Sequence, residues 1–397
     1  MPELSSQKSV DSERFARLLS ATQDLDTPFA VIDEPSLWAN ATDLVRRANG
    51  VPIRVASKSV RVRSIIKDTV ARDGFAGVMS YSLAESNWLV DNGIDDVLLA
   101  YPTTSRSALD YLVDDGRRLA QITVMVDSVE ALDHIDSLLG AGHPAIRVCI
   151  DVDASLKIGP AHLGVRRSPV HSAAEAGALA SAIAARPGFH LVGVMFYDAQ
   201  IAGLPDSSPA VRLIKKRSAA ELLDRRAKVV DAVSDHATLE IVNAGGSGSL
   251  EVGGADPVIT ELTAGSGLFV PTLFDGYDAF EPRPAAYFAL SVVRKPAPDI
   301  ATLFGGGYIA SGATNKNRQP TPTWPPGLKA VGTEGAGEVQ SPVKGPAALD
   351  LHIGDRVVMR HAKAGEMCER FDEVAIISGN GRATLTPTYR GEGKNFG

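Results

Sequence analysis

Eight short runs of apolar, mostly β-branched residues alternate with helical segments between residues 53 and 263. This alternation is typical of βαβ units around a parallel sheet, and eight such units predict an α/β fold with a (β/α)8 TIM barrel. The predicted strands are Ile53–Ser57, Gly77–Tyr81, Asp96–Tyr101, Ile122–Val126, Ile146–Val152, Leu191–Tyr197, Leu239–Asn243 and Val258–Thr263. The predicted helices include Val60–Asp73, Ser82–Asn92, Ser128–Ala141 and Ser208–His236. A ninth run, Phe29–Asp33, precedes the barrel and is free to pair elsewhere.

The character of the sequence changes after Phe274, where loops rich in proline and glycine separate short strands and no long helix is predicted. The strands expected there are Ala286–Val293, Arg356–Arg360, Val374–Ile377 and Ala383–Thr386. We therefore predict a barrel over residues 27–274 and a C-terminal β domain over residues 275–397, with residues 1–26 packing on the β domain. The long irregular loop 304–327 suits a role on the substrate side or at a subunit interface.

Composition narrows the class of protein. A net charge of −7 over 397 residues argues against a nucleic-acid or anionic-membrane surface. No apolar run approaches the ~18 residues of a membrane span, and no signal peptide is recognisable. We expect a cytoplasmic enzyme with a small-molecule substrate, in which Cys149 and Cys368 form no disulfide.

Two glycine-rich turns follow the last two predicted barrel strands. In barrels of this type the loops after strands 7 and 8 commonly bind a phosphate group. Glycine lets backbone N–H groups approach an anion, and serine hydroxyls add further donors. The residues expected to form this cradle are Gly245, Gly246, Ser247, Gly265 and Ser266.

Lys58 directly follows the first predicted strand and therefore lies at the barrel mouth, where barrel enzymes place their active sites. A lysine there can be a surface ion-pair partner, or its amine can form a Schiff base. Facing a phosphate cradle, the amine matches what pyridoxal 5'-phosphate (PLP) needs, because that cofactor carries an aldehyde and a phosphate. Tyr197 and Asn243 end two other strands at the same mouth.

Four segments of the chain resemble the fold-type III PLP enzymes: 27–33, 55–58, 191–197 and 243–247. Among these enzymes the chain is most similar to the D-threonine aldolase and D-serine dehydratase group, also called amino acid deaminase/aldolase, whose barrel is alanine racemase-like. The resemblance implies that Lys58 is the Schiff-base lysine and that Tyr197 and Asn243 lie beside the cofactor. It also implies a homodimer in which the β domain of one subunit covers the barrel mouth of the other.

The chain departs from this family in two places. The motif Arg-x-Gly-Val, which follows strand 5 in the family, is here His162–Leu163–Gly164–Val165, with Arg166 after it. The metal-dependent members carry His-x-Cys or His-x-Asp near the C-terminus, whereas His361 is followed at the second position by Lys363.

Three interpretations of the run around His361 remain open. Imidazole and thiolate are good ligands for zinc, so His361 with Cys368, or with Glu366, is a candidate site for Zn²⁺ or Mn²⁺. Alternatively, the ammonium of Lys363 replaces the positive charge of a metal. In the third interpretation Cys368 is a buried strand residue and His361 is a solvated side chain.

The sequence therefore predicts a PLP-dependent lyase acting on β-hydroxy D-amino acids, either an aldolase or a deaminating dehydratase, with Lys58 and His361 as catalytic residues. An amino-acid racemase is an alternative, and it requires a second base for which Tyr308 is the candidate. A non-catalytic PLP-binding protein and a sugar-phosphate barrel enzyme without PLP are further alternatives.

Overall fold

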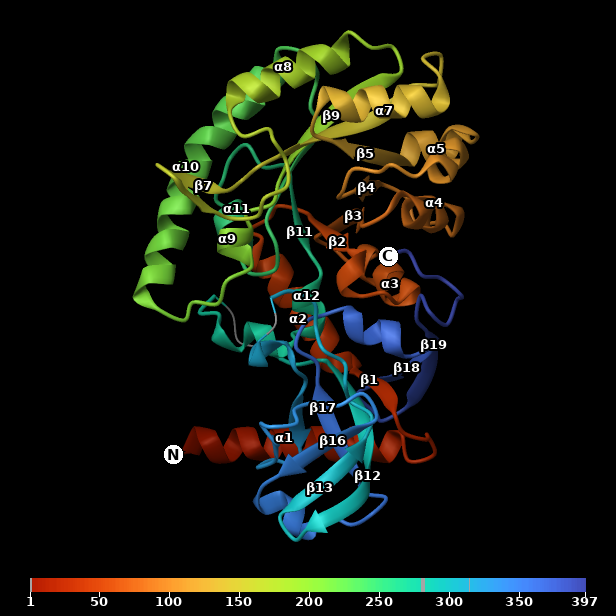
Figure 1. The fold of residues 1–397 in the computed structure, drawn as a ribbon, viewed down its shortest axis with the longest axis vertical. Helices are drawn as coiled ribbons and strands as arrows, with labels where there is room; N and C mark the ends of the chain where they lie inside the picture. The colour runs from red at the N-terminus through yellow and green to blue at the C-terminus, as the bar shows by residue number, and fades with distance from the viewer. Residues whose placement is uncertain (1, 280–282, 314) are drawn as a thin grey trace.

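The computed structural model describes residues 2–279, 283–313 and 315–397. Its long axis joins a barrel to a separate β-rich unit, which occupy the upper and lower halves of Figure 1. The chain begins in the lower unit and runs through the barrel. It then returns to the lower unit, so residues from both ends of the sequence lie side by side there.

The upper unit is a closed barrel of eight parallel strands in the order β10-β11-β2-β3-β4-β5-β6-β9. The strands are β2 (Ile53–Ala56), β3 (Phe75–Ser80), β4 (Val97–Leu99), β5 (Ile122–Val126), β6 (Ile146–Val152), β9 (Phe189–Phe196), β10 (Ile241–Ala244) and β11 (Glu261–Ala264). Each overlaps one of the eight predicted runs, so the predicted fold class is confirmed. Among the described residues no helix has the length and apolar character needed to cross a bilayer.

Helices surround the barrel, and serine residues account for where several of them begin. Ser82, Ser105, Ser128, Ser172 and Ser208 each accept a backbone N–H bond from the third residue of the following helix. The helices are α2 (Glu34–Arg47), α3 (Arg63–Val70), α4 (Leu83–Asp91), α5 (Arg106–Val113), α6 (Gly116–Gln121), α7 (Val129–Leu139), α8 (Ala173–Ala184), α9 (Ala199–Ala202), α10 (Pro209–Ser234), α11 (Leu250–Gly253) and α12 (Ser266–Phe269). Short 3-10 helices are η1 (Ser57–Ser59), η2 (Thr272–Gly276), η3 (Lys316–Arg318), η4 (Pro346–Asp350) and η5 (Glu366–Arg370).

Side chains alternate between two cores along each barrel strand, as expected when successive residues point to opposite faces. One set fills the barrel interior and includes Met79, Leu98, Met125, Cys149 and Met195. The other set packs against the surrounding helices. Cys149 is buried with its thiol free, so neither it nor the equally free Cys368 forms a disulfide.

The lower unit contains a nine-stranded sheet with the path β15-β16-β13-β12-β1-β18-β19, to which β14 and β17 add. Its strands are β1 (Phe29–Asp33), β12 (Ala286–Ala297), β13 (Ile300–Phe304), β14 (Thr321–Trp324), β15 (Lys329–Ala330), β16 (Gln340–Lys344), β17 (Arg356–Arg360), β18 (Glu373–Ile377) and β19 (Ala383–Pro387). A hairpin of β7 (Leu156–Ile158) and β8 (Ala161–Leu163) extends from the barrel. Sequence analysis missed β13 to β16, which are short and lie among turn-forming residues.

Strand β1 pairs antiparallel with β12 and parallel with β18, so it belongs to the lower sheet although it precedes the barrel in sequence. The proposed boundaries at residues 27 and 274 place this strand with the barrel. The pairing shows that the lower unit draws on both ends of the chain, and the domain division stays a prediction.

The N-terminal segment forms a helix, α1 (Pro2–Ala21), which lies across the lower sheet in Figure 1. Phe15 and Leu18 are buried against this sheet. The Phe15 ring lies edge-on to Tyr287 at 5.3 Å and stacks on Trp324 at 5.2 Å. Sequence analysis expected packing here without predicting the helix, because few apolar residues mark its inner face.

Replacing Phe15 with alanine tests whether α1 stabilises the lower unit. Phe15 is 2% exposed, so Phe15→Ala is expected to lower the free energy of unfolding by ~3–5 kcal/mol in urea denaturation. Val10 lies on the same helix but is 56% exposed, so Val10→Ala is the matched control and should change it by less than ~0.5 kcal/mol. Equal effects of the two substitutions would show that α1 contributes little to stability.

Candidate active site

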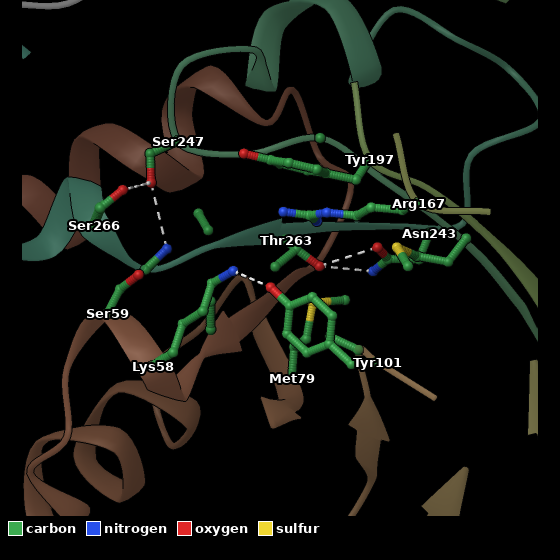
Figure 2. A pocket seen from close by; sticks show the side chains of 17 residues that line it. Lys58, Ser59, Met79, Tyr101, Arg167, Tyr197, Asn243, Ser247, Thr263 and Ser266 are labelled. Carbon is green, nitrogen blue, oxygen red and sulfur yellow. Dashed lines mark hydrogen bonds between the residues drawn. The ribbon is translucent and has the colours of Figure 1, made fainter. Parts of the chain in front are cut away.

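A cavity of about 580 Å³ opens at the C-terminal ends of the barrel strands. It is lined by all eight residues for which the sequence predicted a role near the cofactor: Lys58, Tyr197, Asn243, Gly245, Gly246, Ser247, Gly265 and Ser266. Figure 2 shows how they surround one space, with Lys58 and Tyr101 on one side and Ser247 and Ser266 of the two glycine-rich turns on another. The cavity is where a barrel fold places its chemistry.

Lys58 lies in the 3-10 turn η1, which continues directly from strand β2. Its Nζ donates to the hydroxyl of Tyr101, 2.6 Å away, and lies 5.2 Å from the centre of that ring. Burial by itself raises the pKa of the Tyr101 phenol, but the positive charge and hydrogen bond of Lys58 outweigh it, so this pKa is lowered. The pair can therefore share a proton inside the cavity.

Ser247 joins the two glycine-rich turns. Its hydroxyl oxygen accepts the backbone N–H groups of Gly267 at 2.9 Å and Gly265 at 3.3 Å, and the Ser266 hydroxyl lies 3.4 Å away (Figure 2). A hydroxyl carries one proton of its own, so with its oxygen occupied as an acceptor Ser247 keeps that proton available for an anion in the cavity. This arrangement fits a phosphate.

Gly265 shows why the second turn needs glycine. A Cβ atom at this position would lie 2.6 Å from the carbonyl oxygen of Ala56 and 2.9 Å from the Cβ of Ser59. The turn after β11 therefore packs directly against the segment that carries Lys58, and any side chain would separate the two. This close approach and the spare Ser247 proton indicate that the residues fit a PLP-sized group with an aldehyde at one end and a phosphate at the other.

Arg167 is a cavity residue that sequence analysis missed. Its guanidinium lies 5.5 Å from the ring centre of Tyr101 and 5.1 Å from that of Tyr197, and it extends into the cavity in Figure 2. In the sequence, His162 stands where the family motif has an arginine, and Arg166 lies nearby. The residue that lines the cavity is the next one along the chain.

Asn243 lies at the base of the cavity in a polar network. Its side-chain amide donates to Glu261 at 2.7 Å and to Thr263 at 2.8 Å. Glu261 in turn pairs with the buried guanidinium of Arg54, with an N–O distance of 2.6 Å. These contacts hold the amide in one orientation, because each of its partners is itself fixed.

Two contacts join the C-terminal part of the chain to the barrel near Lys58. Glu85 accepts the Tyr389 hydroxyl at 2.9 Å and the backbone N–H of Tyr81 at 2.7 Å, and burial raises the pKa of Glu85 to about 7. Gly365 has a φ of +87°, and a Cβ there would lie 1.9 Å from the carbonyl oxygen of Lys58. The C-terminal part of the chain thus packs on the backbone of the lysine itself.

His361 lies in a neighbouring chamber and not in the cavity of Lys58. It is 2% exposed, so the interpretation with a solvated histidine is wrong. Nδ1 lies 3.2 Å from the carbonyl oxygen of Ala286, which assigns the ring proton to Nδ1 and leaves Nε2 as an acceptor. Nε2 is buried and has no partner among the described residues. Burial, assisted by Arg360, lowers the pKa of His361 to about 3, so the ring is neutral at physiological pH.

The side chains around His361 do not fit a divalent metal. No group of three potential ligands gathers anywhere in the described parts of the chain. Cys368 lies in η5 and not in a strand, does not line the chamber, and burial raises the pKa of its thiol to about 12. The chamber instead holds Lys363, whose Nζ lies 3.9 Å from Glu366. The His361–Cys368 metal site gains no support from this geometry and stays a prediction.

The lower unit reaches the mouth of its own barrel. Ser311, Arg318, Lys363 and Glu366 line an outer chamber together with Lys58. The resemblance assigned this covering to a second subunit, and the homodimer stays a prediction. Tyr308, the candidate second base of a racemase, packs on Phe288 at 4.9 Å and does not line the cavity of Lys58.

Comparison with known proteins agrees with this architecture. The family model described as "Alanine racemase, N-terminal domain" matches residues 32–271. A D-threonine aldolase from Arthrobacter sp. is 26% identical over 289 residues, which cover 71% of this chain and 72% of that protein.

Two solved structures share the fold. D-threonine aldolase from Filomicrobium marinum has a TM-score of 0.76 and 20% identity, over 92% of this chain and 95% of that one. D-threo-3-hydroxyaspartate dehydratase from Delftia sp. HT23 has a TM-score of 0.72 and 20% identity, over 92% and 97% of the two chains.

The family match extends over more than half of the chain, and the residues it covers include the complete barrel with Lys58 and both glycine-rich turns. The chain therefore belongs to the alanine racemase N-terminal domain family, the barrel of the fold-type III PLP enzymes.

Proposed function

We propose that this chain is a PLP-dependent lyase that acts on β-hydroxy D-amino acids, with Lys58 as the residue that binds the cofactor covalently. The observation that carries the proposal is the single cavity in which the Lys58 amine faces the Ser247 and Gly265 turns. The D-threonine aldolase and D-threo-3-hydroxyaspartate dehydratase relatives support the substrate class. The homodimer is part of the same proposal.

PLP supplies an electron sink for a bond at the substrate's Cα. The chain holds the phosphate through the hydroxyl of Ser247 and the glycine-rich turns. Arg167, whose guanidinium lies between the rings of Tyr101 and Tyr197, would supply positive charge to a cofactor held in the same cavity. Together these residues fix which face of the substrate meets Lys58.

Lys58 and Tyr101 form the proton-transfer pair of the proposed site. With their heavy atoms 2.6 Å apart, they are close enough to pass a proton directly. With cofactor and substrate bound, the Lys58 Nζ would be the group that takes a proton from Cα, and the Tyr101 hydroxyl would hold the Lys58 amine in place. A dehydratase needs this step, whereas an aldolase needs removal of the proton on the β-hydroxyl.

His361 is proposed to accept a hydrogen bond from the β-hydroxyl of the substrate. Its Nε2 carries a lone pair, is buried and has no partner among the described residues, and the Nδ1 contact fixes the ring. The chamber of His361 and the outer chamber above Lys58 share four lining residues: Arg61, Ser311, Lys363 and Glu366. Lys363 provides the positive charge that metal-dependent members obtain from a metal.

Lys58 is expected to be the attachment site of PLP, because its amine is the one that faces the phosphate cradle. After borohydride reduction of the purified protein, peptide mass spectrometry should find reduced PLP on the peptide that contains Lys58. Lys58→Ala should abolish activity without lowering the melting temperature, while Lys67→Ala, an exposed lysine on α3, should retain both. An adduct on any other lysine would contradict the assignment.

Ser247→Ala is expected to weaken PLP binding by about ten- to a hundredfold, since a hydrogen bond to a charged group contributes ~1.5–3 kcal/mol. Equilibrium titration of the apoprotein with PLP measures the change. Ser207→Ala, at an exposed position outside the cavity, is the control and should bind PLP like the unaltered protein. Unchanged affinity in Ser247→Ala would place the phosphate elsewhere.

The protein should consume D-threonine, giving either glycine and an aldehyde or a 2-keto acid and ammonia, and it should leave L-threonine intact. His361→Gln is expected to lower kcat by up to ~10²-fold, because it removes the imidazole that positions the β-hydroxyl. Product analysis by chromatography distinguishes the two reactions. Interconversion of D- and L-alanine without turnover of any β-hydroxy D-amino acid would identify a racemase instead.

Dialysis against EDTA tests the metal question. Full activity after chelation is expected, because Lys363 occupies the position of the second metal ligand. Activity that disappears with EDTA and returns with Zn²⁺ or Mn²⁺ would instead support a metal held by His361 with Cys368 or Glu366.

A further inference from the structure

The outer chamber above Lys58 carries an excess of positive charge. Its empty volume is about 1270 Å³, and both the barrel and the lower unit line it. The cationic side chains in its wall are Lys58, Arg61, Arg167, Arg318 and Lys363. The one carboxylate in the wall, among the described residues, is that of Glu366.

Some of this charge is already compensated. Arg61 pairs with Glu369, with an N–O distance of 2.8 Å. The carboxylate of Glu366 accepts the backbone N–H of Ser311 at 2.9 Å, while its second oxygen lies 3.9 Å from Lys363. Lys363 also donates to the hydroxyl of Ser311 at 2.8 Å. This contact orients the ammonium without neutralising it.

Arg318 has no such compensation. Its guanidinium lies against Gly312, where an added Cβ would be 3.1 Å from the central guanidinium carbon. Its Nε is buried without a hydrogen-bond partner, and no carboxylate in the described parts of the chain pairs with it. A partly buried guanidinium without a carboxylate partner is costly, so an anion from outside the chain would stabilise it.

The cationic side chains are divided between the inner cavity and the outer chamber. Lys58 and Arg167 line the inner cavity that the cofactor would occupy, whereas Arg318 and Lys363 line the outer chamber and not the inner cavity. The phosphate cradle is built from glycine and serine and does not involve the outer pair. Arg318 and Lys363 therefore lie where the substrate side chain would extend away from the cofactor, and Lys363 also borders the chamber of His361.

We propose that Arg318 and Lys363 form a subsite for an acidic substrate side chain, so that the preferred substrate is a β-hydroxy D-amino acid with a second carboxylate. This inference rests on the proposed function and specifies its substrate. A neutral side chain would leave the guanidinium of Arg318 without an anionic partner in a chamber from which the substrate excludes water. A carboxylate pairs with both, and Arg offers it two parallel N–H donors.

Binding of two ligands that cannot undergo the β-hydroxyl chemistry tests the proposal on the PLP-loaded protein. D-aspartate and D-asparagine have nearly the same shape and lack a β-hydroxyl, so they differ mainly in the charge at issue. Isothermal titration calorimetry is expected to give at least about tenfold tighter binding of D-aspartate, the equivalent of ~1.4 kcal/mol. Equal affinities would overturn the proposal.

Single substitutions locate the effect. Arg318→Gln and Lys363→Gln should each weaken D-aspartate binding about tenfold and leave D-asparagine binding within about twofold. Lys316→Gln removes the same charge from an exposed position two residues from Arg318 and should change neither affinity. A parallel loss for both ligands would assign the two cations to the α-carboxylate and overturn the proposal.

Failure of the subsite proposal can be distinguished from failure of the proposed function. Lys58 labelling and D-threonine turnover test the cofactor and the reaction without involving the acidic side chain. Turnover of D-threonine together with equal binding of the two ligands would retain the lyase and refute this subsite.

Discussion

The arrangement of the site depends on one seam in the barrel, where the first barrel strand β2 meets the last one, β11. Val55 pairs with Ala264 across this seam, and the buried Arg54–Glu261 ion pair spans it. An ion pair buried to this degree would be costly if broken, because either charge would be left without a partner. Closure at this point brings Lys58 beside Gly265, although the two are separated by most of the barrel in sequence.

The lower unit contributes side chains to the mouth of the site. Its sheet incorporates β1, so the chain is anchored there before the barrel begins and returns there after the barrel ends. The loops it sends upward pack Gly365 on the Lys58 backbone and place Lys363 and Arg318 around the mouth. The barrel thus carries Lys58 and the two glycine-rich turns, and the lower unit adds charged side chains at the mouth above them.

Both departures from the family pattern involve a cationic side chain. At the first, the family motif places its arginine at the position of His162, and here Arg167 lies beside the rings of Tyr101 and Tyr197 instead. At the second, the family has a cysteine or aspartate, and here Lys363 lines the chamber of His361. Lys363 is half-buried, and burial lowers its pKa while Glu366 opposes this effect. A mouth of this charge favours anions over metal ions.

The sequence by itself determined the eight barrel strands, the position of Lys58 and the two glycine-rich turns, because strand periodicity and turn chemistry depend on neighbouring residues. Only the tertiary structure decided the partners of β1, the burial of His361, the place of Cys368 in a 3-10 helix and the entry of Arg167 and Arg318 into the site. Each of these depends on contacts between segments far apart in the chain. Burial and charge pairing are properties of those contacts, and no local pattern records them.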